Sequence, residues 1–321
     1  MMENYYNTML KALQTGNIVR KTIVSGPYIG DEALYRGNAQ IATYQQTPHS
    51  FDTGEVLSET LGAKVHLVLC GGGHVAKELY ALAVLMDMEV SILDEREEFC
   101  NKELYPKADL HCAPFLKTLT EKQTWVKPYY VLVTRGHGFD QVCLEQTLGL
   151  PHSYIGMIGS KNKVKITLDN LRKKGFSEDL LATVHSPIGL SIGAITASEI
   201  AISIMAEIIS VYRKEEKAVR LDPKLLEKLS QSKGYILARV IEKTGSAPCD
   251  VGFQIAIFAD GTTSGTVGGG MVEAKTIEHA QEMLSAKASR AEIIHYNLDS
   301  SKAGSLGMIC GGDAKILFQV R

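Results

Sequence analysis

The sequence has no run of about 18 or more apolar residues, so a membrane-spanning helix is not expected. Its formal net charge is only -2 over 321 residues, which gives no excess of positive charge to attract nucleic acid or an anionic membrane. The N-terminal stretch "MMENYYNTMLKALQTG" lacks a basic region and a cleavage site typical of a signal peptide. We therefore expect a cytoplasmic protein that binds neither nucleic acid nor membranes.

Cysteine is also scarce. The six cysteines form no CxxC pair, and their spacings fit no zinc site. In a reducing compartment most of them should be free thiols that act as small buried hydrophobic side chains.

What remains is an ordinary globular composition, with 45% hydrophobic and 22% charged residues. The length indicates two or three domains. We expect an N-terminal α+β segment at 1–63, a central domain at 64–222 and a smaller C-terminal domain at 223–321. Residues 45–63 show no clear period and are expected to cross to the central domain, and the charged stretch 213–224 reads as a helix tail and a linker.

The central domain alternates between apolar runs and helical patterns. This alternation predicts an α/β fold with a Rossmann-like, doubly wound parallel sheet. The expected strands are 65–70, 89–93, 110–113, 129–134, 154–159 and 182–185. The C-terminal domain reads as α+β, with a hairpin turning at Asp260 and Gly261.

A glycine loop follows the first central strand. The stretch "VHLVLCGGGHVAKEL" places Gly71, Gly73 and Ala76 in the pattern GxGxxA, with Gly72 inside it. This is the dinucleotide fingerprint between a strand and a helix. Gly71 permits a tight turn, and Gly73 lets the backbone approach a phosphate at the helix N-terminus.

Two side chains near this loop are candidate contacts. Asp94 ends the next expected strand and is placed to accept a hydrogen bond from a ribose 2′-OH, which favours NAD. His74 is either a ligand contact or a solvated residue of the first helical turn. Rossmann-like folds host many ligands, so dinucleotide binding itself stays open.

Further polar residues follow other strands, at the edge of the sheet where ligands bind. Arg135, His137 and Asp140 in "TRGHGFD" are candidates for acid–base chemistry, although Asp140 is equally an N-cap of the next helix. Ser160 and Lys161 follow another strand, and Lys161 is either an anion contact or a solvated residue.

A second glycine loop lies in the C-terminal domain. Gly268, Gly269 and Gly270 stand directly before a helical pattern in "TTSGTVGGGMVEA". Such a loop offers N–H donors with no side chains in the way. Two glycine loops predict two ligands, or two ends of one large ligand.

Taken together, these segments resemble the xanthine dehydrogenase accessory factor (XdhC/CoxI) family. The resemblance is carried by "LVLCGGGHVAKEL", "ILDEREEF", "VTRGHGFD", "YIGMIGSKNK", "HSPIGLSIGAITASEIAISIMAEI", "GSAPCDVGFQIAIFADGTTSGTVGGGMVEA" and "GMICGG". It implies an accessory protein, not a xanthine dehydrogenase in itself. Such a maturation factor binds the molybdenum cofactor, presents it for sulfuration by a cysteine desulfurase, and supports its insertion into a molybdenum hydroxylase.

The resemblance also gives roles to single residues. Glu273 is a candidate contact to the pterin N–H groups, or only a favourable charge at a helix N-terminus. Cys310, before two glycines, is a candidate soft ligand for molybdenum or a sulfur-handling thiol, or else a structural cysteine. Cys249 stands where the family often has an arginine, which weakens the case for an anion contact there.

Two features depart from the family pattern. The glycine-run domain follows the Rossmann-like domain here, although it usually precedes it. The stretch "NIVRKTIVSG" near the N-terminus also resembles "GYILARVIEKTG" of the C-terminal domain. The N-terminal segment is therefore either a truncated copy of that domain or a chance similarity.

Two other functions stay open from the residues alone. One is an NAD-dependent oxidoreductase acting on a small substrate, with His137 as the acid or base. The other is a nucleotide-sensing regulatory module without chemistry. A homodimer is the expected assembly, since symmetric dimers are the commonest oligomers.

Overall fold

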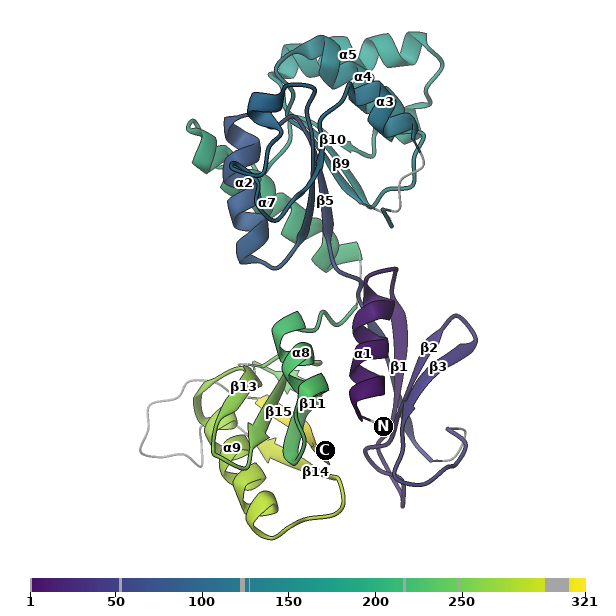
Figure 1. Cartoon of the computed structure of the whole chain (residues 1–321), viewed down its shortest axis with the longest axis vertical. Helices are drawn as coiled ribbons and strands as arrows, with labels where there is room; N and C mark the ends of the chain where they lie inside the picture. Colours follow the sequence, from purple (N-terminus) through teal and green to yellow (C-terminus); the bar gives the residue numbers. More distant parts are fainter. Residues whose placement is uncertain are drawn as a thin grey trace. The chain divides into compact units, whose positions relative to one another are not determined.

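A computed structural model describes the chain except residues 1, 52–53, 122–124, 127, 216–217, 247–248 and 298–311. The side chains of residues 2–4, 137 and 215 are also outside the description. The chain forms two compact units, one made of 1–63 together with 218–321, the other of 64–217 (Figure 1). Among the described residues, no helix is long and apolar enough to cross a membrane.

The unit formed by residues 64–217, called the Rossmann unit below, contains one parallel six-stranded sheet in the order β10-β9-β8-β5-β6-β7. Its strands are β5 (His66–Cys70), β6 (Glu89–Leu93), β7 (Asp109–His111), β8 (Tyr129–Leu132), β9 (Tyr154–Met157) and β10 (Val184–His185). Its helices are α2 (His74–Leu85), η1 (Glu97–Phe99), α3 (Phe115–Thr120), α4 (His137–Thr147), α5 (Lys161–Lys173), α6 (Glu178–Leu181) and α7 (Ala197–Glu215). The strand order reverses between β5 and β8, which confirms the predicted doubly wound fold.

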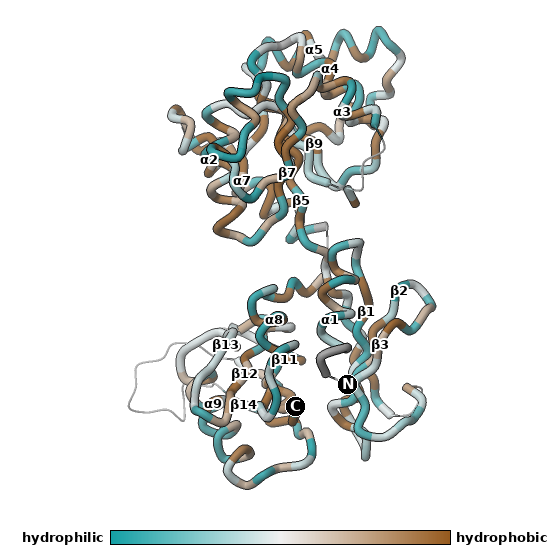
Figure 2. Tube along the Cα trace, in the orientation of Figure 1, coloured by the Kyte–Doolittle hydropathy of each residue, from teal (hydrophilic) through white to brown (hydrophobic). Residues whose placement is uncertain are grey.

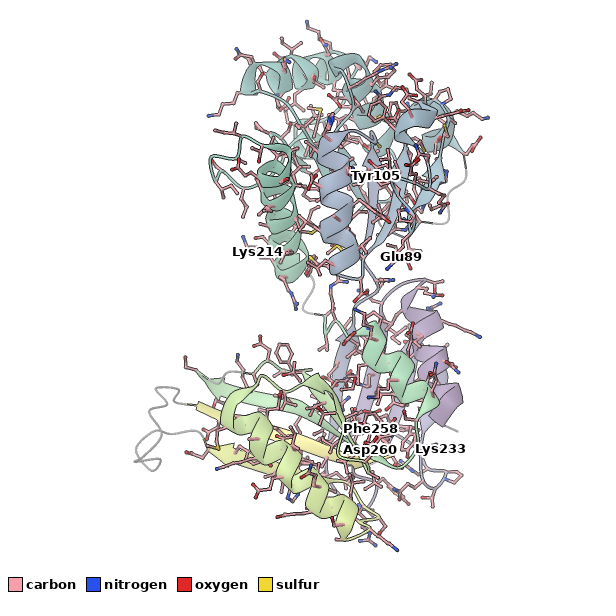
Figure 3. All side chains as sticks on the ribbon, turned by 60° about the vertical axis from the view of Figure 1, so that its left-hand side comes forward. Glu89, Tyr105, Lys214, Lys233, Phe258 and Asp260 are labelled. Atoms are coloured by element: carbon pink, nitrogen blue, oxygen red, sulfur yellow. The ribbon has the colours of Figure 1, made fainter. Side chains whose placement is uncertain are left out.

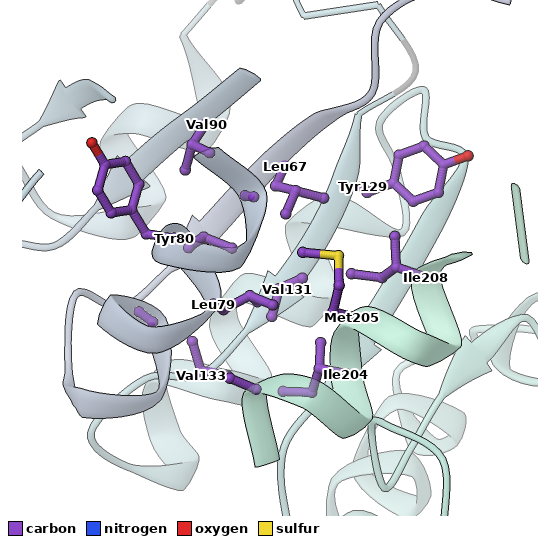
Figure 4. Packing of buried hydrophobic residues seen from close by; sticks show 14 of the residues in the cluster. Leu67, Leu79, Tyr80, Val90, Tyr129, Val131, Val133, Ile204, Met205 and Ile208 are labelled. Carbon is purple, nitrogen blue, oxygen red and sulfur yellow. The ribbon is translucent and has the colours of Figure 1, made fainter. Parts of the chain in front are cut away.

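Helices cover both faces of this sheet, so its central strands are apolar on both sides and appear brown in Figure 2. On one face, α2 and α7 pack on the strands through residues such as Leu79, Val131 and Ile204 (Figure 4). On the other face, α4 and α5 contribute Leu144 and Leu171 to a second core. This packing fixes the carboxyl edge of the sheet, where the predicted site residues of this unit lie.

The other unit, called the split unit below, contains two antiparallel sheets, in the orders β3-β2-β1-β4 and β13-β12-β11-β15-β14. Its N-terminal elements are α1 (Met2–Leu13), β1 (Ile18–Ile23), β2 (Glu32–Arg36), β3 (Ala39–Tyr44) and β4 (Val56–Leu61). Its C-terminal elements are α8 (Pro223–Gln231), β11 (Tyr235–Gly245), β12 (Gln254–Phe258), β13 (Thr263–Thr266), α9 (Gly270–Ser285), β14 (Glu292–Asn297) and β15 (Gly312–Val320).

The alternation along β11 explains how the split unit is layered. Ile236, Ala238 and Val240 pack into the core that α9 covers. Tyr235 and Leu237 point to the opposite face, into a core shared with α1 and the N-terminal sheet. The N-terminal segment therefore packs against the C-terminal domain within one unit.

Two sequence interpretations were incomplete, although residues 213–215 do end helix α7 as expected. Residues 45–63 contain β4, which completes the N-terminal sheet beside β1. Residues 213–224 are not simply a tail and a linker, because α8 starts at Pro223, where the Asp222 side chain accepts a hydrogen bond from the Lys224 amide. Val219 exchanges backbone hydrogen bonds with Thr60 and Gly62, so residues 218–222 belong to the split unit.

Candidate functional site

Close packing around the first glycine loop excludes side chains at two of its three glycines. Gly71 has a φ of +112°, and a Cβ on it would lie 2.5 Å from the carbonyl oxygen of Val133. A Cβ on Gly72 would lie 2.0 Å from the carbonyl oxygen of Phe99. A Cβ on Gly73 would meet nothing within 4 Å. Neighbouring backbone atoms therefore pack closely against Gly71 and Gly72, whereas the space beside Gly73 is free.

Gly73 is also the N-cap of α2, and no side chain caps this helix. The first N–H groups of a helix have no partners inside the helix and carry a partial positive charge. His74, the first residue of α2, is exposed. The open end of the loop therefore offers backbone donors to an anion, as the sequence predicted for this position.

Asp94 lies beneath the loop. Its carboxylate accepts hydrogen bonds from the Gly72 amide at 2.9 Å and from the Arg96 amide at 3.1 Å. The Arg96 guanidinium donates two more, at 2.9 and 2.8 Å. Burial raises the pKa of the Asp94 carboxyl, but the hydrogen bonds from Arg96 and Gly72 outweigh it and lower the pKa below its ordinary value. A ribose would have to displace Arg96 to reach Asp94, because only 1% of the residue is exposed.

Tyr105 completes this arrangement and was not singled out from the sequence. Its hydroxyl donates a hydrogen bond of 2.8 Å to the carbonyl oxygen of Gly72 (Tyr105 is labelled in Figure 3). Both backbone groups of Gly72 are thus held by buried side chains. A tyrosine in an irregular stretch gives no local signal for this role, although Arg96, two residues after Asp94, does suggest an ion pair.

The loop after β8 lies beside the loop after β6. Arg135 forms an ion pair of 2.6 Å with Glu95. Asp140 is buried, and it accepts hydrogen bonds from the hydroxyl of Thr134 at 2.6 Å and from its amide at 3.1 Å. Asp140 therefore holds the loop that precedes α4. His137 is the first residue of α4, and its side chain lies outside the described residues.

The remaining strand ends carry exposed polar residues. Ser160 is the N-cap of α5 and Lys161 its first residue, and both are exposed. No side chain caps α5. Ahead of α7, Thr196 and Glu199 exchange the hydrogen bonds of a capping box, at 2.9 and 3.3 Å.

The second glycine loop lies in the split unit. Gly268, Gly269 and Gly270 all have positive φ, at 113°, 78° and 60°, which explains why glycine stands at all three positions. Added Cβ atoms on Gly269 and Gly270 would meet nothing within 4 Å. The loop precedes α9, which has no side-chain cap.

Glu273 fills part of this second loop. Its Oε2 accepts hydrogen bonds from the amides of Val267 and Gly269, at 3.0 and 3.2 Å, and from the hydroxyl of Thr266 at 2.5 Å. The sequence predicted open N–H donors at this loop. In the structure, the Glu273 carboxylate accepts hydrogen bonds from two of these amides. The loop therefore presents the negative charge of Glu273 to a ligand.

The cysteines divide as expected. Cys70, Cys100, Cys143 and Cys249 are buried, Cys112 is exposed, and all five are free thiols. Burial raises the pKa of the Cys249 thiol, which disfavours a reactive thiolate there. Cys310 lies outside the described residues. In the described part of the chain, no group of three or more His, Cys, Asp or Glu residues is arranged to hold a metal ion.

A cavity of about 420 Å³ lies at the amino edge of the parallel sheet, opposite the glycine loop. His66, Glu89 and Asp109, which begin β5, β6 and β7, line it together with Trp125. None of the predicted site residues lines this cavity. The predicted site residues of the Rossmann unit follow its strands at the carboxyl edge instead.

The fold and these loops define an α/β protein in which a doubly wound sheet, with a glycine loop at its carboxyl edge, accompanies a smaller α+β domain that carries a second glycine loop. Residues 67–208 match the XdhC Rossmann domain, and residues 229–297 match the XdhC and CoxI family. The chain belongs to the XdhC family, which confirms the resemblance seen in the sequence.

Two curated relatives match about half of the chain. One is "Uncharacterized protein YqeB" of Escherichia coli, 31% identical over 50% of this chain and 30% of the relative. The other comes from Bacillus subtilis and is named as a probable xanthine dehydrogenase subunit; it is 30% identical over 52% of this chain and 49% of the relative. The matches thus span less than half the length of either relative.

A solved structure supports the fold. The crystal structure of a xanthine dehydrogenase from Bacillus halodurans matches with a TM-score of 0.54 and 23% identity, over 68% of this chain and 65% of that one.

Proposed function

We propose that the protein is an accessory factor for a xanthine dehydrogenase-type molybdenum hydroxylase, and that it binds the molybdenum cofactor during maturation. Its membership of the XdhC family supports this proposal, together with the Bacillus subtilis relative named for xanthine dehydrogenase. The observation that carries it in this chain is the uncapped start of α2 behind the open Gly73.

Each glycine loop, considered within its own unit, fits one kind of chemical group on the cofactor. The phosphate tail suits the first loop, where backbone N–H groups of α2 face open space at Gly73. The amino and ring N–H groups of the pterin suit the second loop, where Glu273 supplies a carboxylate beside the open Gly269 and Gly270. When bound, the cofactor supplies the molybdenum centre that the hydroxylase needs for its redox chemistry.

The proposed partners are the hydroxylase and a cysteine desulfurase that delivers sulfur. Cys310 is the cysteine of the "MICGG" motif, and Cys249 is the cysteine of the "GSAPC" motif. The burial of Cys249 makes Cys310 the better candidate for contact with molybdenum or sulfur. A homodimer and a cytoplasmic location remain part of this proposal.

The test is anaerobic incubation with molybdenum cofactor, followed by gel filtration and pterin fluorescence. Gly73→Val should weaken retention at least tenfold, because the added side chain covers the start of α2 while the φ of -79° tolerates it. The matched control is Gly149→Val after α4, where a Cβ has only an ordinary contact at 3.5 Å. Glu273→Gln should weaken pterin retention less than Gly73→Val does. Cys310→Ala tests whether the Cys310 thiol contributes to pterin retention.

Different outcomes separate the alternatives. Failure of the wild-type protein to retain pterin would overturn the cofactor proposal. A change in NADH fluorescence on binding, together with turnover of a small hydroxy or carbonyl compound, would instead favour an oxidoreductase. NAD binding without turnover would favour a nucleotide sensor. Equal retention by wild type and Gly73→Val would remove the first loop from the binding site.

A further inference from the structure

A cluster of charged side chains is buried inside the split unit, on the face of β11 that points away from α9. We call it the arginine–glutamate cluster. It consists of Arg20, Arg239, Arg321, Glu32 and Glu59, all buried. Buried charges of this kind are costly unless they are paired.

The pairs join the N-terminal segment to the C-terminal domain. Glu32 lies 2.9 Å from Nη1 of Arg239 and 2.7 Å from Nη2 of Arg321. Glu59 lies 3.1 Å from Arg20 and 3.5 Å from Arg239. Burial raises the pKa of the Glu32 carboxyl, but the three arginines outweigh it and hold the pKa far below its ordinary value. Both carboxylates come from residues 1–63, whereas two of the three arginines come from the C-terminal domain.

The two sheets that enclose this cluster are copies of one pattern. The order β3-β2-β1-β4 corresponds to β13-β12-β11-β15, antiparallel throughout. The registers also agree, since Glu32 pairs with Thr22 and Tyr44 as Gln254 pairs with Arg239 and Thr266. Pairing of Thr22 with Leu57 likewise corresponds to pairing of Arg239 with Leu317. The equivalent positions are Arg20 and Leu237, Thr22 and Arg239, Glu32 and Gln254, Glu59 and Gln319, and Leu61 and Arg321.

The copies meet as the halves of a symmetric dimer do. Helix α1 precedes β1 as α8 precedes β11, and Met9 of α1 shares a core with Leu226 of α8. Nη2 of Arg239 donates a hydrogen bond of 2.7 Å to the hydroxyl of its own equivalent, Thr22. Contact between equivalent positions is the mark of an isologous interface.

The symmetry is broken by charge. Glu32 and Glu59 of the N-terminal copy are replaced by Gln254 and Gln319 in the C-terminal copy. Two C-terminal faces placed together would bury Arg239 and Arg321 from each side, with no carboxylate from these positions. Such uncompensated burial is strongly unfavourable.

We propose that the face carrying Arg239 and Arg321 is an interaction surface for an acidic copy of its own fold, which residues 1–63 supply within the same chain. The same surface rejects the C-terminal domain of a second chain. A homodimer of this protein must therefore form through another face.

The two copies differ in their binding loops as well. Between Tyr44 and Val56 the N-terminal copy has the short stretch 45–55, "QQTPHSFDTGE", with no glycine run. The C-terminal copy has the second glycine loop, α9 and β14 at the corresponding place. Of the two copies of the fold in the chain, only the C-terminal copy has the glycine loop. The N-terminal copy serves as its packing partner.

The test uses full-length variants and hydrogen–deuterium exchange of β1, β4, β11 and β15. The double variant replaces Glu32 and Glu59 by glutamine, the residue that stands at the equivalent positions 254 and 319 of the C-terminal copy. Exchange in all four strands should then be roughly 100-fold faster, because two buried carboxylates and their four ion pairs with Arg20, Arg239 and Arg321 are lost. Adding Gln254→Glu and Gln319→Glu puts two carboxylates back on the buried face, with position 254 paired with Arg239 in the sheet, and should restore part of the protection. The control is Glu55→Gln with Glu227→Gln, at two exposed positions.

Unchanged exchange in the double variant would overturn the proposal, and so would a fourfold variant no better protected than the double one. If the double variant fails to fold, soluble expression becomes the measurement. Recovery in the fourfold variant then supports the proposal, and its absence overturns it. Appearance of a dimer through β11 and β15 in wild type, shown by cross-linking, would also overturn it.

Discussion

The two glycine loops look alike in the sequence, but they are built on opposite principles. The first is compact, since neighbouring carbonyl oxygens leave no space for a Cβ on Gly71 or Gly72, and Gly71 also has a positive φ. The second is open, since Gly269 and Gly270 are glycines because of their positive φ, with free space around them. A glycine run therefore reports two different constraints, and only its surroundings tell them apart.

The carboxylates beside the loops differ in the same way. Asp94 is buried and neutralised by Arg96, so the first loop presents mainly its N–H groups. Glu273 has no such cation among its hydrogen-bond partners and takes up two loop amides itself. The first loop thus suits an anion, and the second suits a ligand that donates hydrogen bonds.

The largest expected effect comes from adding one methyl group to each loop. Gly72→Ala should cost roughly 3 kcal/mol or more, because the Phe99 carbonyl must move out of a 2.0 Å overlap. Gly270→Ala should cost only about 1–2 kcal/mol, from its φ of +60°. Urea unfolding followed by the fluorescence of Trp125 reports the Rossmann unit, and hydrogen exchange of α9 reports the other. Equal losses would contradict the distinction between a packed and an open loop.

The next largest difference between the two units is expected in how their stability depends on acid pH. Burial lowers the pKa of His66 to about 4, so the folded Rossmann unit resists protonation that the unfolded chain accepts near pH 6.5. Its stability should fall by up to about 3 kcal/mol as the pH drops from about 6.5 to 4. In the split unit, the pKa values of Glu32 and Glu59 are lowered in the folded state. The stability of that unit should therefore fall only below about pH 4.5, where the unfolded chain takes up protons that the folded unit does not.

The check is urea unfolding at a series of pH values, with His66→Gln as the variant. This substitution should flatten the pH dependence between about 6.5 and 4 in the Trp125 signal. Retention of the full slope in the variant would show that another group is responsible.

Removal of the two loop carboxylates should give a smaller difference. Asp94→Ala leaves Arg96 and the Gly72 amide without their acceptor and should cost about 2–3 kcal/mol. Glu273→Ala affects a partly exposed carboxylate and should cost about 1 kcal/mol. The exposed Glu98→Ala is the control for the first variant. A larger loss for Glu273→Ala would reverse the comparison.

The smallest effect is expected at Gly73. Gly73→Ala should change the free energy of unfolding by no more than about 0.5 kcal/mol, since the added Cβ meets nothing within 4 Å. Because the same position opens toward the start of α2, ligand retention should be more sensitive to it than stability is. A loss of stability like that of Gly72→Ala would mean that the first loop is packed along its whole length.

Much of the fold was predictable because its signals are local. The continuous apolar run of β5, the glycine pattern after it and the capping box at Thr196 each lie within a few residues. Helix α8 also had a local signal, Asp222 followed by Pro223, which was read as a linker because of the charged residues before it. Strand β4 had little signal of its own, since its place is set by pairing with β1.

The sequence by itself determined the family, the doubly wound sheet and the positions of both glycine loops, because glycine spacing and apolar periodicity are properties of neighbouring residues. Only the tertiary structure decided that Asp94 is paired with Arg96 and that Glu273 enters its own loop. It also decided that residues 1–63 complete the C-terminal domain, through charges that lie more than 200 residues apart in the chain but within hydrogen-bond distance in space. Contacts of that range depend on how whole sheets pack, which no local pattern of residues records.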